Sequence, residues 1–184
     1  YEGSAARIRD INIVGNEAFS EKELRSVFEL KPKGWWPISG RSRYSRERLS
    51  GDLEALRSYY LDRGYINFSV ESTQVAVTPD RNSVYITINV DEGKRYKVGD
   101  VKLAGDIPVD ETLLEPLVMV DKGETFSQRK ITTSSDLLVR RLGNEGYTFA
   151  NVHDYAEVNP ETGDVDVVLY VEPGRKHYVR NVNF

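Results

Sequence analysis

The chain has 184 residues, of which 39% are hydrophobic and 29% charged, and its formal net charge at pH 7 is −4. This composition is typical of a globular protein with one domain or two small ones, and no apolar run approaches the roughly 20 residues of a membrane-spanning helix. The absence of cysteine excludes disulfides, thiolate catalysis and cysteine metal sites, and it is compatible with either redox compartment.

The charges are unevenly distributed along the chain. Residues 7–93 carry 13 basic and 13 acidic side chains, whereas residues 94–174 carry 9 and 15, a net charge of −6. Within the first half, Lys31–Arg48 contains six basic residues and one acidic residue, Glu47. The second half should repel polyanions. Lys31–Arg48 could attract phosphate or acidic partners, although a solvated loop and helix face is the simpler interpretation.

A strand and a short helix are predicted at the start of the chain. Arg7–Val14 alternates loosely between polar and apolar residues, which indicates a strand that ends at the turn Gly15-Asn16. Ser20–Phe28 follows as a short helix, because Ser20 and Glu23 have the spacing of a capping box.

A longer helix is predicted after a loop that contains Trp35-Trp36. These two tryptophans could form an exposed recognition surface, but packing back over the core is the favoured interpretation. The helix begins after the N-cap Ser45 and ends at Gly64, which suits a left-handed C-terminal position. Its apolar residues share one face of a helix with 3.6 residues per turn: Leu49, Leu53, Leu56 and Tyr60.

A β-hairpin is predicted next, with strands Ile66–Val77 and Val84–Val90 joined by a turn at 78–83. The apolar parity of the first strand changes across Glu71–Gln74, which indicates a bulge or a strong twist. The first strand is the better candidate for a sheet edge.

The same order of elements then recurs, with Gly146-Tyr147 lying 82 residues after Gly64-Tyr65. The second copy comprises a strand at Val98–Ala104, a short helix opening at Asp110, a helix from Ser127 to Gly146, and strands at Tyr147–Val158 and Val165–Val171. We therefore predict an α+β fold with two tandem β-α-α-β-β domains, each a three-stranded mixed sheet covered by two helices.

Units of this order and length resemble POTRA domains. The first copy is similar to the third POTRA domain of the BamA family of outer-membrane β-barrel assembly proteins. The segments that carry this resemblance are Ile11–Asn16, Gly51–Tyr65, Ser72–Val75 and Thr78–Asp80, and Trp35-Trp36 fits it too. The resemblance implies that residues 1–6 are the tail of a preceding domain, 7–93 a third-like domain, 94–174 a fourth-like domain, and 175–184 the first strand of the next.

The resemblance also implies a function and partners. Such domains form a periplasmic scaffold that recruits accessory lipoproteins and guides unfolded outer-membrane proteins by β-augmentation at a sheet edge. The implied partner of the third-like domain is the propeller-shaped lipoprotein BamB, and other lipoproteins would bind through domains outside this chain. We expect Val75 and Val77 to point away from the core as apolar anchors, the alternative being that they fill it. The expected partner-binding residues are Val70, Glu71, Ser72, Thr73, Gln74, Val75, Ala76, Val77 and Tyr85.

Three other interpretations follow from the sequence. The POTRA region of a related Omp85-type transporter is one alternative. An enzyme is poorly supported, because His153 and His177 are isolated and no metal, cofactor or phosphate-binding motif occurs. A single-stranded nucleic-acid binder would use Lys31–Arg48 with its interleaved aromatic residues, but the net acidity opposes it. We expect no catalytic, cofactor or metal site, no nucleic-acid partner and no membrane span.

Overall fold

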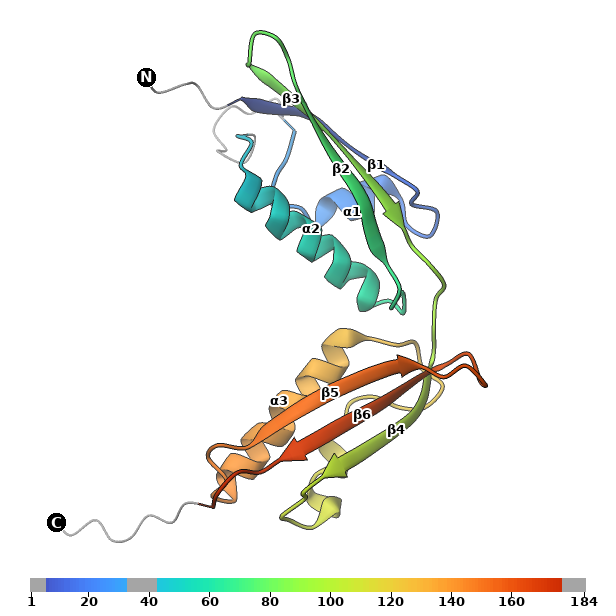
Figure 1. Ribbon diagram of the computed structural model, residues 1–184, viewed down its shortest axis with the longest axis vertical. Coiled ribbons are helices and arrows are strands. Elements are labelled where there is room, and N and C mark those ends of the chain that lie inside the picture. The colour runs from blue at the N-terminus through green and yellow to red at the C-terminus, as the bar shows by residue number, and fades with distance from the viewer. Residues whose placement is uncertain (1–5, 33–42, 177–184) are drawn as a thin grey trace, which may run out of the picture. The chain divides into compact units, whose positions relative to one another are not determined.

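The computed structural model describes residues 6–32 and 43–176. They divide into two compact units, one formed by 6–32, 43–61 and 65–94 and the other by 62–64 and 95–176 (Figure 1). Several predictions lie outside the described residues: the tail at 1–5, Trp35-Trp36 with most of the basic segment, and residues 177–184 of the strand predicted at 175–184.

The first unit is a three-stranded mixed sheet with helices on one face (Figure 1). Its elements are β1 (Arg7–Val14), α1 (Glu21–Ser26), α2 (Arg46–Leu61), β2 (Ser69–Val77) and β3 (Ser83–Asp91). The strand order is β1-β3-β2, with β1 parallel and β2 antiparallel to β3. The predicted α+β class and hairpin are confirmed.

The core of the first unit lies between the sheet and α2. Strand β3 alternates regularly, burying Val84, Ile86, Ile88 and Val90 and presenting the residues between them to the other face. Leu56 and Tyr60 of α2 pack against this buried face, as the helical spacing predicts. The capping box at Ser20 and Glu23 is also present, and Gly64 has φ +98°, a left-handed conformation that favours glycine.

Two buried carboxylates connect α2 with other segments of this unit, and the sequence analysis missed both. Asp52 of α2 accepts hydrogen bonds from the backbone N–H groups of Glu29 (2.5 Å) and Leu30 (2.9 Å). Glu92, which follows β3, accepts one from the Tyr60 hydroxyl (2.6 Å) and others from the Ala18 N–H. Burial, and then the hydrogen bond to Glu92, raises the pKa of Tyr60 well above its ordinary value.

The second unit repeats the sheet with a different first helical segment. Its strands are β4 (Val98–Gly105), β5 (Asn151–Val158) and β6 (Val165–Glu172), in the order β4-β6-β5, and they are covered by α3 (Gln128–Asn144). β4 is parallel and β5 antiparallel to β6. The apolar face of α3 is buried at Ile131, Leu138 and Leu142, with Ser127 as its N-cap.

The predicted short helix after Asp110 is instead two single 3₁₀ turns, η2 (Glu111–Leu113) and η3 (Glu115–Leu117). Asp110 is the N-cap, as predicted. Pro116 explains the difference, because it has no N–H to donate to the Thr112 carbonyl and it disfavours the α conformation at Glu115. Each turn closes with i to i+3 hydrogen bonds, such as that from Leu114 N–H to the Glu111 carbonyl (2.8 Å).

Within residues 6–32 and 43–176, no helix has the length and hydrophobicity that a bilayer span requires.

Candidate docking edge of the first sheet

Strand β2 lies at an edge of its sheet. In the order β1-β3-β2, β3 is the central strand, and within the described ranges it is the only strand that pairs with β2. One side of β2 therefore presents backbone N–H and C=O groups that are available to a further strand. The predicted edge position is confirmed.

The register of β2 against β3 corrects the expected direction of the valine anchors. Val70 lies opposite Val90 and Ser72 opposite Asn89, so the register shifts by one residue between Val70 and Ser72. This irregularity confirms the predicted bulge. Because it absorbs the extra residue, the apolar residues before and after it lie on the same face of the sheet.

Val75 and Val77 consequently lie on the helix-covered face. They are opposite Ile86 and Val84, which are buried, and directly opposed residues of antiparallel strands share a face. The expectation that the change of parity turns them away from the core is wrong. They nevertheless do not fill the core, since Val75 is 37% and Val77 52% exposed.

Tyr85 belongs to the opposite face. It lies on β3 across from Ala76, and its side chain is 47% exposed. An added strand beside β2 alternates its side chains between the two faces, so it would meet the valines on one face and the region of Ala76 and Tyr85 on the other. The predicted apolar residues thus flank one edge without forming a single patch.

The other predicted site residues lie along the same strand. Glu71, within the bulge, and Gln74 are exposed, while Val70 and Thr73 are half-buried. The Ser72 hydroxyl accepts a hydrogen bond from the Asn89 side-chain amide (2.7 Å) across the pair. The structure therefore brings the predicted residues together on one edge and the strand beside it.

The turn after β2 adds a fixed negative charge. Asp80 accepts hydrogen bonds from the Thr78 hydroxyl and the Asn82 backbone and side-chain amides, and these hold the pKa of its carboxyl below the ordinary value. Arg81 follows Asp80 in the same turn, so the end of the edge near Val77 carries charges of both signs.

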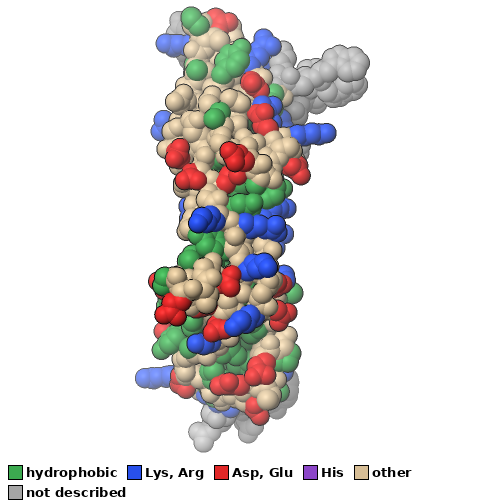
Figure 2. All heavy atoms as spheres, turned by 90° about the vertical axis from the view of Figure 1, so that its right-hand side faces the viewer, with side chains coloured by type: hydrophobic (Ala, Val, Ile, Leu, Met, Phe, Trp, Pro, Cys, Tyr) green, Lys and Arg blue, Asp and Glu red, His purple; other side chains and the backbone are tan. Residues whose placement is uncertain are grey.

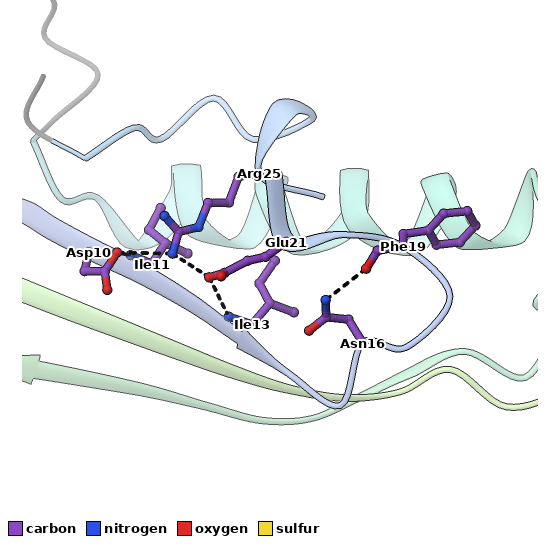
Figure 3. A network of polar contacts seen from close by, with 7 residues as sticks. All are labelled: Asp10, Ile11, Ile13, Asn16, Phe19, Glu21 and Arg25. Atoms are coloured by element: carbon purple, nitrogen blue, oxygen red, sulfur yellow. Dashed lines mark hydrogen bonds and ion pairs between the residues drawn. The ribbon is translucent and has the colours of Figure 1, made fainter. Parts of the chain in front are cut away.

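The opposite edge of the same sheet, at β1, is closed by side chains. The Ile11 N–H donates to Asp10 Oδ1 (3.0 Å) and the Ile13 N–H to Glu21 Oε1 (3.4 Å), while Arg25 forms ion pairs with both carboxylates (Figure 3). A strand approaching β1 would have to displace these groups. The sequence analysis missed this arrangement, although the i, i+4 pair Glu21 and Arg25 was a visible signal.

The surface around these elements is mixed in charge. Figure 2 shows acidic and basic side chains interspersed on one face, with hydrophobic side chains in separate patches. In the described residues, no group of three or more histidine, aspartate or glutamate side chains is placed to hold a metal ion. His153 lies 3.4 Å from Glu172 on the exposed strands of the second unit. What the β2 edge itself offers to a partner is backbone hydrogen bonding.

Comparison with known proteins gives a family match over almost the whole chain. The POTRA model, described as surface antigen variable number repeat, matches residues 6–93 and again 96–174.

Curated relatives and solved structures agree with this match. The chain is 31% identical to the outer membrane protein assembly factor BamA of Neisseria meningitidis over 99% of its length, and 29% identical to that of Buchnera aphidicola over 100%. It spans only 23% and 30% of those two proteins. The crystal structure of Haemophilus influenzae BamA POTRA domains 3–5 superposes with a TM-score of 0.78 and 27% identity, covering 93% of this chain and 67% of that one.

Proposed function

The chain belongs to the POTRA family, and from this premise we propose that it is a periplasmic scaffold segment that acts in the assembly of outer-membrane β-barrel proteins. Its relatives are named as assembly factors for outer membrane proteins. The observation that carries the proposal is that β2 forms an open edge of its sheet. The other edge of the same sheet, at β1, is closed by Asp10, Glu21 and Arg25.

We assign the two units to the third and fourth POTRA positions of such a protein. The similarity to a structure of POTRA domains 3–5 supports this assignment, as do the third-domain segments of the first copy. On this assignment 7–93 is the third-like domain, 94–174 the fourth-like domain, and 1–6 and 175–184 belong to the neighbouring domains.

The mechanism we propose is β-augmentation at β2. Four or five added backbone hydrogen bonds, each contributing roughly 0.5–1.5 kcal/mol net, amount to only a few kcal/mol before the entropy of association is subtracted. Binding by backbone alone should therefore be weak and tolerant of sequence. Such binding suits a client chain that must be released.

A stable partner needs side-chain contacts in addition, and we propose that BamB makes them here. Val75 and Val77 expose apolar surface on one face of the edge and Tyr85 on the other. A partner that adds a strand or loop beside Val70–Val77 buries both sets at once, and apolar and aromatic anchors contribute most of the binding energy at such interfaces. The two faces together supply the specificity that the backbone lacks.

The test is binding of purified BamB, without its lipid anchor, to this chain, measured by calorimetry. Replacement of both Val75 and Val77 by Asp should weaken binding at least tenfold, while the circular dichroism spectrum and melting temperature stay nearly unchanged. Tyr155→Asp, an exposed aromatic residue on β5, is the matched control and should bind as wild type. Unchanged binding by the double variant, or loss of its fold, would refute the assignment.

A further inference from the structure

The two units can be compared residue by residue at the edges formed by β1 and β4. A glycine with positive φ lies directly after β1 and at the end of β4, Gly15 (+94°) and Gly105 (+93°), 90 residues apart. The N-caps of the following helical segments, Ser20 and Asp110, keep the same spacing. The comparison therefore aligns Ile11 with Val101, Ile13 with Leu103, Glu21 with Glu111 and Arg25 with Glu115.

The ion pairs that close the first edge have no counterpart in the second. Arg25 joins Asp10 to Glu21, and Glu21 accepts the Ile13 N–H. Glu115 stands where this arginine would be needed, and it carries the opposite charge. In the part of the chain that the structure describes, neither Glu111 nor Glu115 forms an ion pair. Asp100, the equivalent of Asp10, pairs with Lys122 instead (2.7 Å).

The apolar residues of the two edges differ in how deeply they are buried. Ile11 and Ile13 are buried, whereas Val101 and Leu103 remain half-buried. They line a hollow of about 400 Å³ between β4 and the segment 111–121, together with Val118 and Val120. We call this hollow the β4 groove. The shorter 3₁₀ turns, which replace α1, leave it uncovered.

The lining of the β4 groove carries a net negative charge. Its charged lining residues are Glu111, Glu115 and Asp121 against Lys102 alone. This excess agrees with the net charge of −6 over residues 94–174. A ligand that fits both the apolar floor and the acidic rim must combine alternating apolar side chains with a cation.

We propose that the β4 groove binds an extended segment of an unfolded polypeptide whose apolar residues alternate and which carries an arginine or lysine. The apolar side chains cover Val101 and Leu103, and the cation of the ligand takes the position that Arg25 fills in the first unit. The inference rests on the proposed scaffold function, because that function is the reason for taking the ligand to be an unfolded client chain. It adds a second site on a different edge, with a charge preference that β2 does not have.

The test uses two fluorescein-labelled nine-residue peptides of alternating valine and threonine, one with a central arginine and one with a central glutamate. On wild type at low salt, the arginine peptide should bind about three- to tenfold more tightly, as expected for added contacts with one or two exposed carboxylates. Amide resonances of Val101–Leu103 should shift on its addition. Equal affinities for the two peptides would overturn the proposal.

The decisive variant is Glu115→Arg, which supplies the missing arginine beside Glu111. It should abolish the preference for the arginine peptide and leave the melting temperature and BamB binding unchanged. Glu161→Arg, the same charge reversal in the exposed β5–β6 turn, should retain the preference. An equal loss in both variants would mean that net charge alone attracts the peptide, which contradicts a site. Shifts confined to β2 would also contradict it while leaving the proposed function intact, and failure of BamB binding would refute that function separately.

Discussion

Val75 faces Ile86 across the β2–β3 pair, yet Ile86 is 1% exposed and Val75 is 37% exposed. Both side chains lie on the helix-covered face, so the difference arises from the position of the strand rather than from the face. The central strand β3 is buried on this face, whereas Val75 and Val77 of the edge strand remain exposed. An apolar residue can therefore belong to the core face and still be available to a partner.

Truncating these two residues should have very different effects on stability. We expect Ile86→Ala to reduce the free energy of unfolding of the first unit by about 2–5 kcal/mol, because it leaves a cavity in a packed core. Val75→Ala should cost less than about 1 kcal/mol. Urea denaturation followed through amide resonances of β3 resolves the first unit even if the two units unfold separately. Similar costs for both variants would show that Val75 is a core residue.

The buried pair Tyr60 and Glu92 predicts a loss of stability at alkaline pH. Burial and the hydrogen bond to Glu92 raise the pKa of Tyr60 in the folded state above its ordinary value of 10.0. The unfolded chain therefore loses the Tyr60 proton first, and stability that is complete below pH 10 should decline as the pH rises further. The measurement is the urea midpoint between pH 8 and 11.

Two phenylalanine variants isolate the contribution of Tyr60. Tyr60→Phe should be less stable than wild type at pH 8, because Glu92 loses a buried hydrogen-bond donor, but its decline above pH 10 should be shallower. Tyr85→Phe, at an exposed position, should follow the wild-type decline. The explanation fails if Tyr60→Phe and wild type decline in parallel.

Asp52 should be important for stability although it lies on a helix that the sequence presents as simply amphipathic. Its carboxylate accepts the N–H groups of Glu29 and Leu30, which follow α1 and have no strand to pair with in the described structure. Asp52→Ala leaves two donors without their acceptor and should cost about 1–3 kcal/mol or more. Glu54→Gln, exposed on the same helix, should change stability by less than about 0.5 kcal/mol in the same urea measurement. Equal effects would contradict the role of Asp52.

The fold could be predicted from the sequence because its signals are local. The alternation of β3, the caps at Ser20 and Ser127 and the glycine at position 64 each act within a few residues. Pro116 is equally visible in the sequence, but its effect depends on the length of the helix that contains it. A proline near the start of a long helix is tolerated, whereas a segment of two turns cannot lose a central hydrogen bond and remain an α-helix.

The buried carboxylates and the direction of the valines could not be predicted in the same way. The donors to Asp52 lie 22 and 23 residues away in sequence and those to Glu92 lie 32 and 74 residues away, and no local pattern encodes such pairing. The bulge between Val70 and Ser72 was indicated by the change of parity, but parity alone does not say which face the later residues occupy. That face is set by the register against β3.

The closed edge of β1 gives a final prediction, which concerns the hydrogen exchange of its backbone amides. Arg25 is placed between Asp10 and Glu21, and Glu21 accepts the Ile13 N–H at 3.4 Å. Arg25→Glu places a third negative charge beside these two, so repulsion should drive the carboxylates apart and expose that N–H to water. We expect hydrogen exchange of the Ile13 amide to accelerate about tenfold, equivalent to roughly 1.4 kcal/mol of lost protection, with the overall fold retained. Lys22→Glu, exposed on the same helix, is the control and should leave the Ile13 exchange rate within about twofold of wild type. If both variants exchange alike, the carboxylates do not protect β1, and the contrast between the closed β1 edge and the uncovered β4 groove has no basis in charge.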